Sequence, residues 1–300
     1  MLSNNLIRTV IFLSFNGPGI VGNILIFVRH VYTFIMGTEK KPIDLIIIHM
    51  AFSNILFIYS TGIRLIATAF YFRNFLGEAA CKILIFLARV ARGLSICTTC
   101  LLSMVQAVTV NPRMTLWRKL KPQTAGQVLL YLLFFWIFNF LVSSNLLCYI
   151  TTVSSVNRSG AGIYTGYCYM LPSRQTVKWF FLAFMILFEV VFQSLMGWSS
   201  VSMAVHLYKH HKRVSYLRSS KCANNSSPET RATQSTLFLM TCFLFFYWVD
   251  FIFSFYIGSI LIHDSIILAI KTFLSLGYAV LSPFILIARD FHLVNCWHIQ

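Results

Sequence analysis

The chain has 300 residues, of which 58% are hydrophobic and only 11% are charged. A typical soluble domain has about 25% charged residues and offers no place for this much apolar surface. The composition therefore excludes an ordinary soluble domain and predicts a membrane protein.

Seven apolar segments follow one another along the chain. Each has at least about 20 residues, enough to cross a ~30 Å hydrocarbon core at 1.5 Å per residue. The alternating pattern of a membrane barrel is absent, so we expect helices. The sequence thus predicts an all-α membrane protein, a seven-transmembrane-helix bundle that forms one domain over residues 1–300. The expected spans are 8–28, 43–70, 83–107, 126–150, 179–205, 236–260 and 265–288.

Basic residues are distributed unequally between the two sides of this bundle. Fourteen lie in the loops after the first, third and fifth spans and in the C-terminal tail, and six lie on the other side. The positive-inside rule places the N-terminus outside and the C-terminus in the cytoplasm. The net charge of +16 is spread over short loops. It therefore indicates contact with the headgroups of the lipid bilayer, and no binding of nucleic acid is expected.

The N-glycosylation sequons fall on both sides of the predicted membrane. Asn157 lies in the second outer loop, whereas Asn224 and Asn225 lie in the third inner loop. Only a lumenal sequon can meet the glycosylation machinery. We therefore predict a glycan at Asn157 and none at the other two.

Two of the eight cysteines are placed most clearly on the oxidising side of the membrane. These are Cys81, at the outer end of the third span, and Cys168, in the second outer loop. Cytoplasmic thiols stay reduced, and thiols within spans commonly act as small apolar groups. A disulfide between Cys81 and Cys168 would hold the long outer loop across the bundle.

Arg89 and Arg92 stand three residues apart in the third span, on one helix face. The other charged residues expected inside spans are Arg64, Glu189, Asp250 and Lys271. A charge at the membrane centre costs roughly 2.5–3.5 kcal/mol on insertion scales, so each should face the bundle interior and find a partner.

The depths of these charges can be estimated from the helical rise. Arg89 and Arg92 lie about 12 and 16 Å below the outer end of their span. Glu189 and Asp250 lie about 15–16 Å deep, and Lys271 about 9 Å. We expect an ion pair of Arg92 with Glu189, and Asp250 is the candidate partner of Arg89. Two interpretations stay open: the ion pairs of this layer only hold neighbouring helices together, or the layer lines a ligand pocket.

The sequence contains no nucleophile–base pair, no zinc-protease motif and no phosphate-binding loop, so we predict no enzyme, no cofactor and no metal site. His206, His210 and His211 lie beside two lysines. They are interpreted as a basic stretch at the membrane surface.

Four stretches carry a resemblance to a known family. They are HMAFSN at 49–54, CKILIFLARVARGLSICTTCLLSMVQAVTVNP at 81–112, SSPETRAT at 226–233 and LSPFILIARD at 281–290. With these stretches the chain resembles the vomeronasal type-1 receptors, which are G-protein-coupled pheromone receptors, along nearly its whole length. It departs from the broader rhodopsin-like pattern, since Asn54 stands where most such receptors have aspartate. The third span also ends without Asp-Arg-Tyr.

The resemblance implies a chemosensory receptor of the plasma membrane. Such a receptor binds a small, pheromone-like ligand in the outer half of its bundle and activates a heterotrimeric G protein, by resemblance of the inhibitory type. Residues expected to face the G protein are Arg113, Lys119, Lys212, Arg213 and Arg231. A bitter-taste-like receptor is one alternative. A small transporter is another, although repeated broken helices, typical of transporters, are not found.

Overall fold

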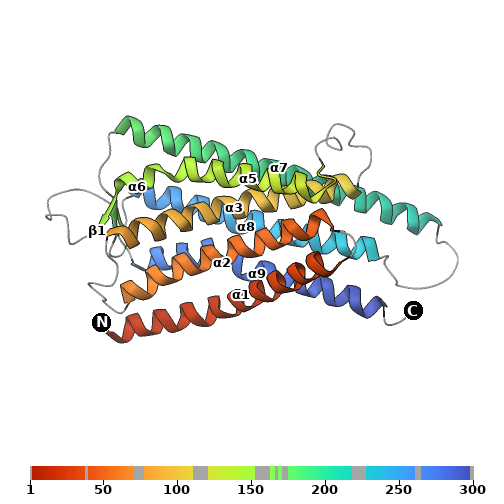
Figure 1. Ribbon diagram of the computed structural model, residues 1–300, viewed down its shortest axis with the longest axis horizontal. Helices are drawn as coiled ribbons and strands as arrows, with labels where there is room; N and C mark the ends of the chain where they lie inside the picture. Colours follow the sequence, from red (N-terminus) through yellow and green to blue (C-terminus); the bar gives the residue numbers. More distant parts are fainter. Residues whose placement is uncertain are drawn as a thin grey trace.

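The computed structural model describes residues 2–37, 40–69, 78–110, 121–152, 163–165, 168–170, 175–217, 228–260 and 265–297. Among these residues, seven long helices lie side by side along one axis (Figure 1). They are α1 (Leu2–Met36), α2 (Pro42–Ala69), α3 (Glu78–Val110), α5 (Ala125–Ser143), α7 (Gln175–Leu217), α8 (Pro228–Ile260) and α9 (Ser265–Trp297). The two termini lie at opposite ends of the bundle (Figure 1).

Six of these helices contain segments that are long and apolar enough to cross a membrane. The segments are Val10–Met36, Pro42–Ile66, Ala79–Val110, Ala125–Leu147, Ala183–Lys209 and Ile270–Ala288. Within the described residues, α8 contributes a shorter apolar stretch, Leu237–Phe253. Large apolar side chains such as Leu130 and Leu141 are exposed on the outside of the bundle. Such a surface suits lipid and not water, so the protein is a multi-pass membrane protein.

The helices extend beyond the predicted spans. The fifth was expected to end at residue 205, but α7 continues to Leu217, and α8 begins at Pro228 instead of residue 236. An apolar window marks the part of a helix that lies in lipid, and polar residues continue the helix beyond it. Pro228 occupies the first position of α8, where its missing N–H has no helical partner to lose.

The predicted span 126–150 is wrong at its end. A capping box of Thr124 and Gln127 begins α5, which ends at Ser143. A short helix α6 (Asn145–Tyr149) follows, and Ile150 already belongs to strand β1 (Ile150–Thr152). The β-branched run Ile150-Thr151-Thr152 favours a strand, although it is continuous with the apolar segment.

A small sheet corrects the expectation of helices alone. Strand β3 (Cys168–Met170) lies between β1 and β2 (Ile163–Thr165), and both pairings are antiparallel. Thr152 pairs with Cys168 in the β1–β3 ladder. The sheet lies at the N-terminal end of the bundle, and β1 contacts α3 (Figure 1).

Helix α3 lies at the centre of the bundle, since it contacts α2, α5, α7 and α8. Its side chains Val90, Leu94 and Leu102 are fully buried in the main hydrophobic core. Because α3 touches so many partners, a polar side chain on it can reach several helices at once. This position determines where the candidate site forms.

Candidate functional site

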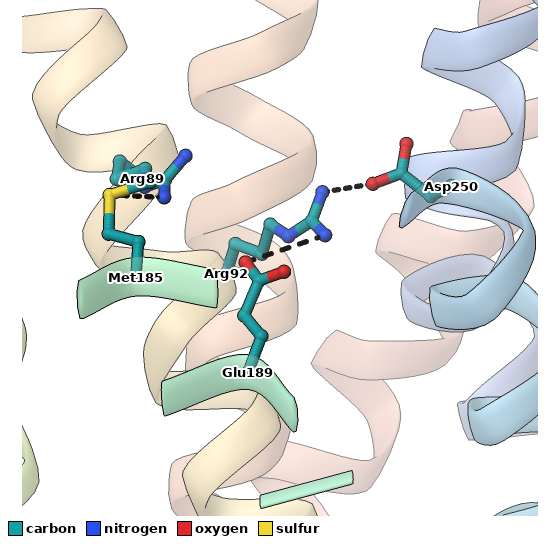
Figure 2. A network of polar contacts seen from close by, with 5 residues as sticks. All are labelled: Arg89, Arg92, Met185, Glu189 and Asp250. Atoms are coloured by element: carbon teal, nitrogen blue, oxygen red, sulfur yellow. Dashed lines mark hydrogen bonds and ion pairs between the residues drawn. The ribbon is translucent and has the colours of Figure 1, made fainter. Parts of the chain in front are cut away.

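Arg92 of α3 joins two other helices through its guanidinium group (Figure 2). Its Nη1 donates to Asp250 Oδ2 of α8, and its Nη2 lies 3.7 Å from Glu189 Oε1 of α7. The side chains are largely buried, with exposures of 17% for Arg92, 16% for Glu189 and 1% for Asp250. The planar fork of arginine suits this double contact, because its two terminal nitrogens point at separate acceptors.

Tyr247 completes the surroundings of Arg92. Its ring centroid lies 5.2 Å from Arg92 Cζ, in a cation–π arrangement. Tyr247 and Asp250 are three residues apart on α8, so they share a helix face. Arg92 therefore contacts α8 at two successive positions and α7 at one.

The expected ion pair of Arg92 with Glu189 is present, but the alternative pair of Arg89 with Asp250 is wrong. Arg89 Nη2 donates to Met185 Sδ of α7, one turn away from Glu189 (Figure 2). Residues three apart on a helix differ by about 60° in direction, since each residue turns about 100°. Arg92 therefore points between α7 and α8, whereas Arg89 points toward α7 alone.

Lys271 of α9 belongs to the same layer. It is partly buried and lies within electrostatic range of Asp250, Arg92, Arg89 and Arg64. Charged side chains from α3, α7, α8 and α9 thus converge, as the estimated depths predicted. We call the set of Arg89, Arg92, Glu189, Asp250 and Lys271 the charged layer.

A second polar network is uncharged and centres on Asn54 of α2. Its Nδ2 donates to Asn23 Oδ1 of α1 at 3.2 Å and to Ser282 Oγ of α9 at 3.0 Å. Its Oδ1 accepts from Ser95 Oγ of α3 at 3.0 Å. Asn54 thereby connects four helices. The sequence pointed to Asn54 only as a departure from the rhodopsin-like aspartate.

A third network joins α2, α3 and α5 through His49. Trp136 Nε1 donates to His49 Nε2 at 2.9 Å. Since Nε2 is the acceptor, the proton of the neutral ring is on Nδ1, which lies 2.9 Å from Thr98 Oγ1. Sequence reasoning missed this triad. A histidine inside an apolar span was the available signal.

Cys81 is buried and disulfide-bonded. It packs beside Leu146 of α6, close to the sheet that contains Cys168. The cysteines described as free thiols are Cys97, Cys100 and Cys242. The pairing of Cys81 with Cys168 stays a prediction.

Several predicted residues lie outside the described part of the chain. These are Arg113, Lys119, Asn157, Asn224 and Asn225. Lys212 is exposed on α7, Arg213 follows it, and Arg231 lies in the first turn of α8. These parts of α7 and α8 lie at the end of the bundle that contains the C-terminus (Figure 1).

A bundle of membrane-spanning helices with ion pairs in its interior defines a polytopic membrane protein with buried charges. The sequence model of the vomeronasal organ pheromone receptor family matches residues 6–299. The chain is 31% identical to vomeronasal type-1 receptor 4 of Homo sapiens over 91% of this chain and 90% of the relative. It is 32% identical to vomeronasal type-1 receptor 45 of Mus musculus, over 95% of this chain and 89% of the relative. The chain therefore belongs to the vomeronasal organ pheromone receptor family, whose members are receptors of the G-protein-coupled type.

Proposed function

We propose that this protein is a seven-span chemosensory receptor of the plasma membrane. Its N-terminus is outside, and residues 1–300 form one receptor domain. A small pheromone-like ligand activates it, and it transmits the signal to a heterotrimeric G protein of the inhibitory type. It is not an enzyme. Membership of the vomeronasal receptor family carries this proposal, and the length and composition of the helices support it.

The ligand-binding region is assigned to the charged layer around Arg89, Arg92, Glu189, Asp250 and Lys271. The observation behind this assignment is the ion pair network that joins α3, α7 and α8 in the half of the bundle nearer the sheet. Buried charges inside a membrane are costly, and they mark binding and signalling sites more often than ordinary packing. A ligand that reaches this layer would contact three helices together.

Nucleotide exchange on purified G proteins tests the proposed function. Membranes containing the chain are screened with small volatile and amphipathic compounds, and one G protein of each class is supplied. We expect a ligand-dependent rise in exchange on the inhibitory class. Ligand-dependent exchange restricted to another class would refute the assigned coupling, and ligand-dependent solute uptake without exchange would indicate a transporter.

A charge swap tests the position of the ligand site. Arg92→Glu places three carboxylates together, and Glu189→Arg places two guanidinium groups side by side, so each should lower surface expression or the ligand response. The double variant restores opposite charges between α3 and α7, but the new carboxylate at position 92 still faces Asp250, so surface expression should recover in part relative to either single variant. Two harmless single changes, or effects that simply add, would remove the support for this position.

The disulfide of Cys81 is assigned to Cys168. The neighbouring strand β1 contacts α3, and Thr152 of β1 pairs with Cys168. Peptide mapping without reduction should find Cys81 linked to Cys168. Linkage to Cys148, which belongs to α6, would contradict the assignment. Loss of the bond should cost about 2–5 kcal/mol or prevent export.

A further inference from the structure

The polar contacts between helices divide the bundle into two parts. Neutral hydrogen bonds through Asn54 connect α1, α2, α3 and α9, and those of His49 add α5. Thr99 of α3 is also within 3.1 Å of the Tyr278 hydroxyl of α9. Five helices are thus connected by uncharged partners that are buried or partly buried. We call α1, α2, α3, α5 and α9 the fixed part.

Helices α7 and α8 are attached to the fixed part in a different way. The polar contacts described between α7 and α3 include the Arg92–Glu189 ion pair and two contacts that involve methionine sulfur. In these, Arg89 donates to Met185, and Ser199 donates to Met104. Sulfur is a weak acceptor. The ion pair is therefore the strongest polar link described between α7 and the fixed part.

The described polar and ring contacts of α8 with α3 are made by Tyr247 and Asp250. Asp250 accepts directly from Arg92, and Tyr247 packs against the same guanidinium group and lies beside Ser95. Toward α9, α8 packs through aromatic rings: Phe243 lies 4.4 Å and Tyr247 lies 6.1 Å from Tyr278, centroid to centroid. These ring contacts carry no charge, whereas the ion pair with Arg92 depends on its atoms staying together.

Arg92 holds its two carboxylates unequally. Asp250 is nearly inaccessible and in direct contact, whereas Glu189 is more exposed and 3.7 Å away. One cation faces two anions, so release from Asp250 leaves Arg92 with Glu189 as its partner. The α3–α8 contact can therefore break without leaving an isolated buried arginine, which would cost about 3–5 kcal/mol. The released Asp250 keeps Lys271 of α9 within electrostatic range.

We propose that the Arg92–Asp250 contact restrains α8 in the inactive receptor and that its release starts signalling. The proposal rests on the proposed function, and it gives the charged layer a regulatory role. A ligand that competes for Arg92 or Asp250 would free α8, whose first turns lie at the end of the bundle assigned to the cytoplasm (Figure 1). Loss of the Asp250 charge should mimic the ligand.

Basal nucleotide exchange without ligand tests the proposal. Asp250→Asn keeps the size of the side chain but removes its charge, so basal exchange at matched surface density should rise by about fivefold or more. Asp250→Glu retains the charge and should stay near the wild-type level. Asp44→Asn is the matched control, because it removes the charge of another buried carboxylate, whose Oδ1 lies 2.9 Å from His30 Nδ1. Unchanged exchange in Asp250→Asn overturns the proposal.

A second variant covers the case in which Asp250→Asn does not reach the surface. Arg92→Gln removes the positive charge, so no ion pair with Asp250 can form. Its basal exchange should also rise. A wild-type level in Arg92→Gln at matched surface density would overturn the proposal by itself.

A distance measurement separates this proposal from the proposed function. Gln127 of α5 and Gln234 of α8 are exposed near helix ends on the same side of the bundle, and both can carry spin labels after mutation to cysteine. Asp250→Asn should add a population with longer distances, and Asp44→Asn should not. Unchanged distances contradict the restraint. Longer distances without exchange on any G protein support the restraint and contradict the proposed function.

Discussion

At the scale of single residues, many polar side chains inside the bundle have hydrogen-bond partners on neighbouring helices. His49 shows how specific such an arrangement becomes. It accepts from Trp136 on Nε2, and its Nδ1–H faces Thr98, whose hydroxyl donates to Leu94 O at 2.7 Å. Along these contacts, each N–H or O–H group has a single acceptor for its proton. The chain of hydrogen bonds therefore fixes the tautomer of the histidine.

Removal of both partners of the Trp136–His49 hydrogen bond should cost less than the sum of the two single removals. Trp136→Phe leaves His49 Nε2 without its donor, and we expect a loss of about 1 kcal/mol, seen as a lower thermal midpoint of the purified protein. His49→Leu alone leaves the Trp136 N–H unsatisfied. The double variant should lose less than the sum of the two. Additive losses would mean that the two side chains act independently.

Asn54 cannot be exchanged for aspartate without loss, although related receptors carry aspartate there. A carboxylate has no N–H to donate, so the bond to Asn23 Oδ1 would be lost and two oxygens would face each other. The Ser282 hydroxyl could reverse its direction and donate instead. Asn54→Asp should lower the thermal midpoint by the equivalent of about 1–3 kcal/mol. Asn54→Ala serves as the control for lost contacts alone. Equal midpoints of Asn54→Asp and the wild type would contradict this account.

At the scale of helices, glycines set how closely neighbours approach. A Cβ atom on Gly93 of α3 would collide with the Asn139 amide of α5, and one on Gly277 of α9 would meet the Phe246 ring of α8. Asn139 is buried and donates to Phe135 O at 2.8 Å, so its side chain cannot turn away freely. Small residues permit such close contacts in membranes, where packing drives association.

Two alanine substitutions test this interpretation of the glycines. Gly93→Ala should lower stability by about 1–3 kcal/mol, because either the helices separate or the Asn139 hydrogen bond breaks. Gly197→Ala of α7 is the matched control, because nothing lies within 4 Å of its added Cβ. It should be neutral or stabilising by about 0.4–1 kcal/mol. Equal thermal midpoints for the two variants would contradict the close approach of α3 and α5.

At the scale of the whole molecule, long apolar runs were enough to find the helices, because lipid demands continuous apolar surface. These runs did not reveal where α7 ends or that Ile150 begins a strand. A helix end or a strand outside the lipid does not need a continuous apolar surface. Depth along a helix follows from counting residues, so the layer of Arg92, Glu189 and Asp250 was predictable. The angle at which a side chain leaves the helix axis cannot be obtained from this counting, and this is why Arg89 was assigned the wrong partner.

The orientation of the bundle in the membrane rests on charge counts and can be tested through glycans. Asn157→Gln should remove the mass shift that a glycosidase detects, because this sequon alone is predicted to reach the lumen. Asn225→Gln should leave the shift unchanged. A shift that survives the first change and disappears with the second would reverse the assignment of outside and inside.

Neutral hydrogen bonds join five helices, whereas ion pairs attach α7 and α8. Water inside the bundle should therefore affect these two kinds of contact differently. Water entering the core weakens a Coulomb attraction strongly, since the effective dielectric constant rises from about 4–20 toward 80. Hydrogen bonds of Asn54 and His49 carry no net charge and depend less on that constant. Water that enters near Arg92 would therefore loosen α7 and α8 while the other five helices keep their places. Bilayer thickness and lipid packing govern how far water enters. They should consequently shift the equilibrium between the inactive and the active receptor without contacting the charged layer.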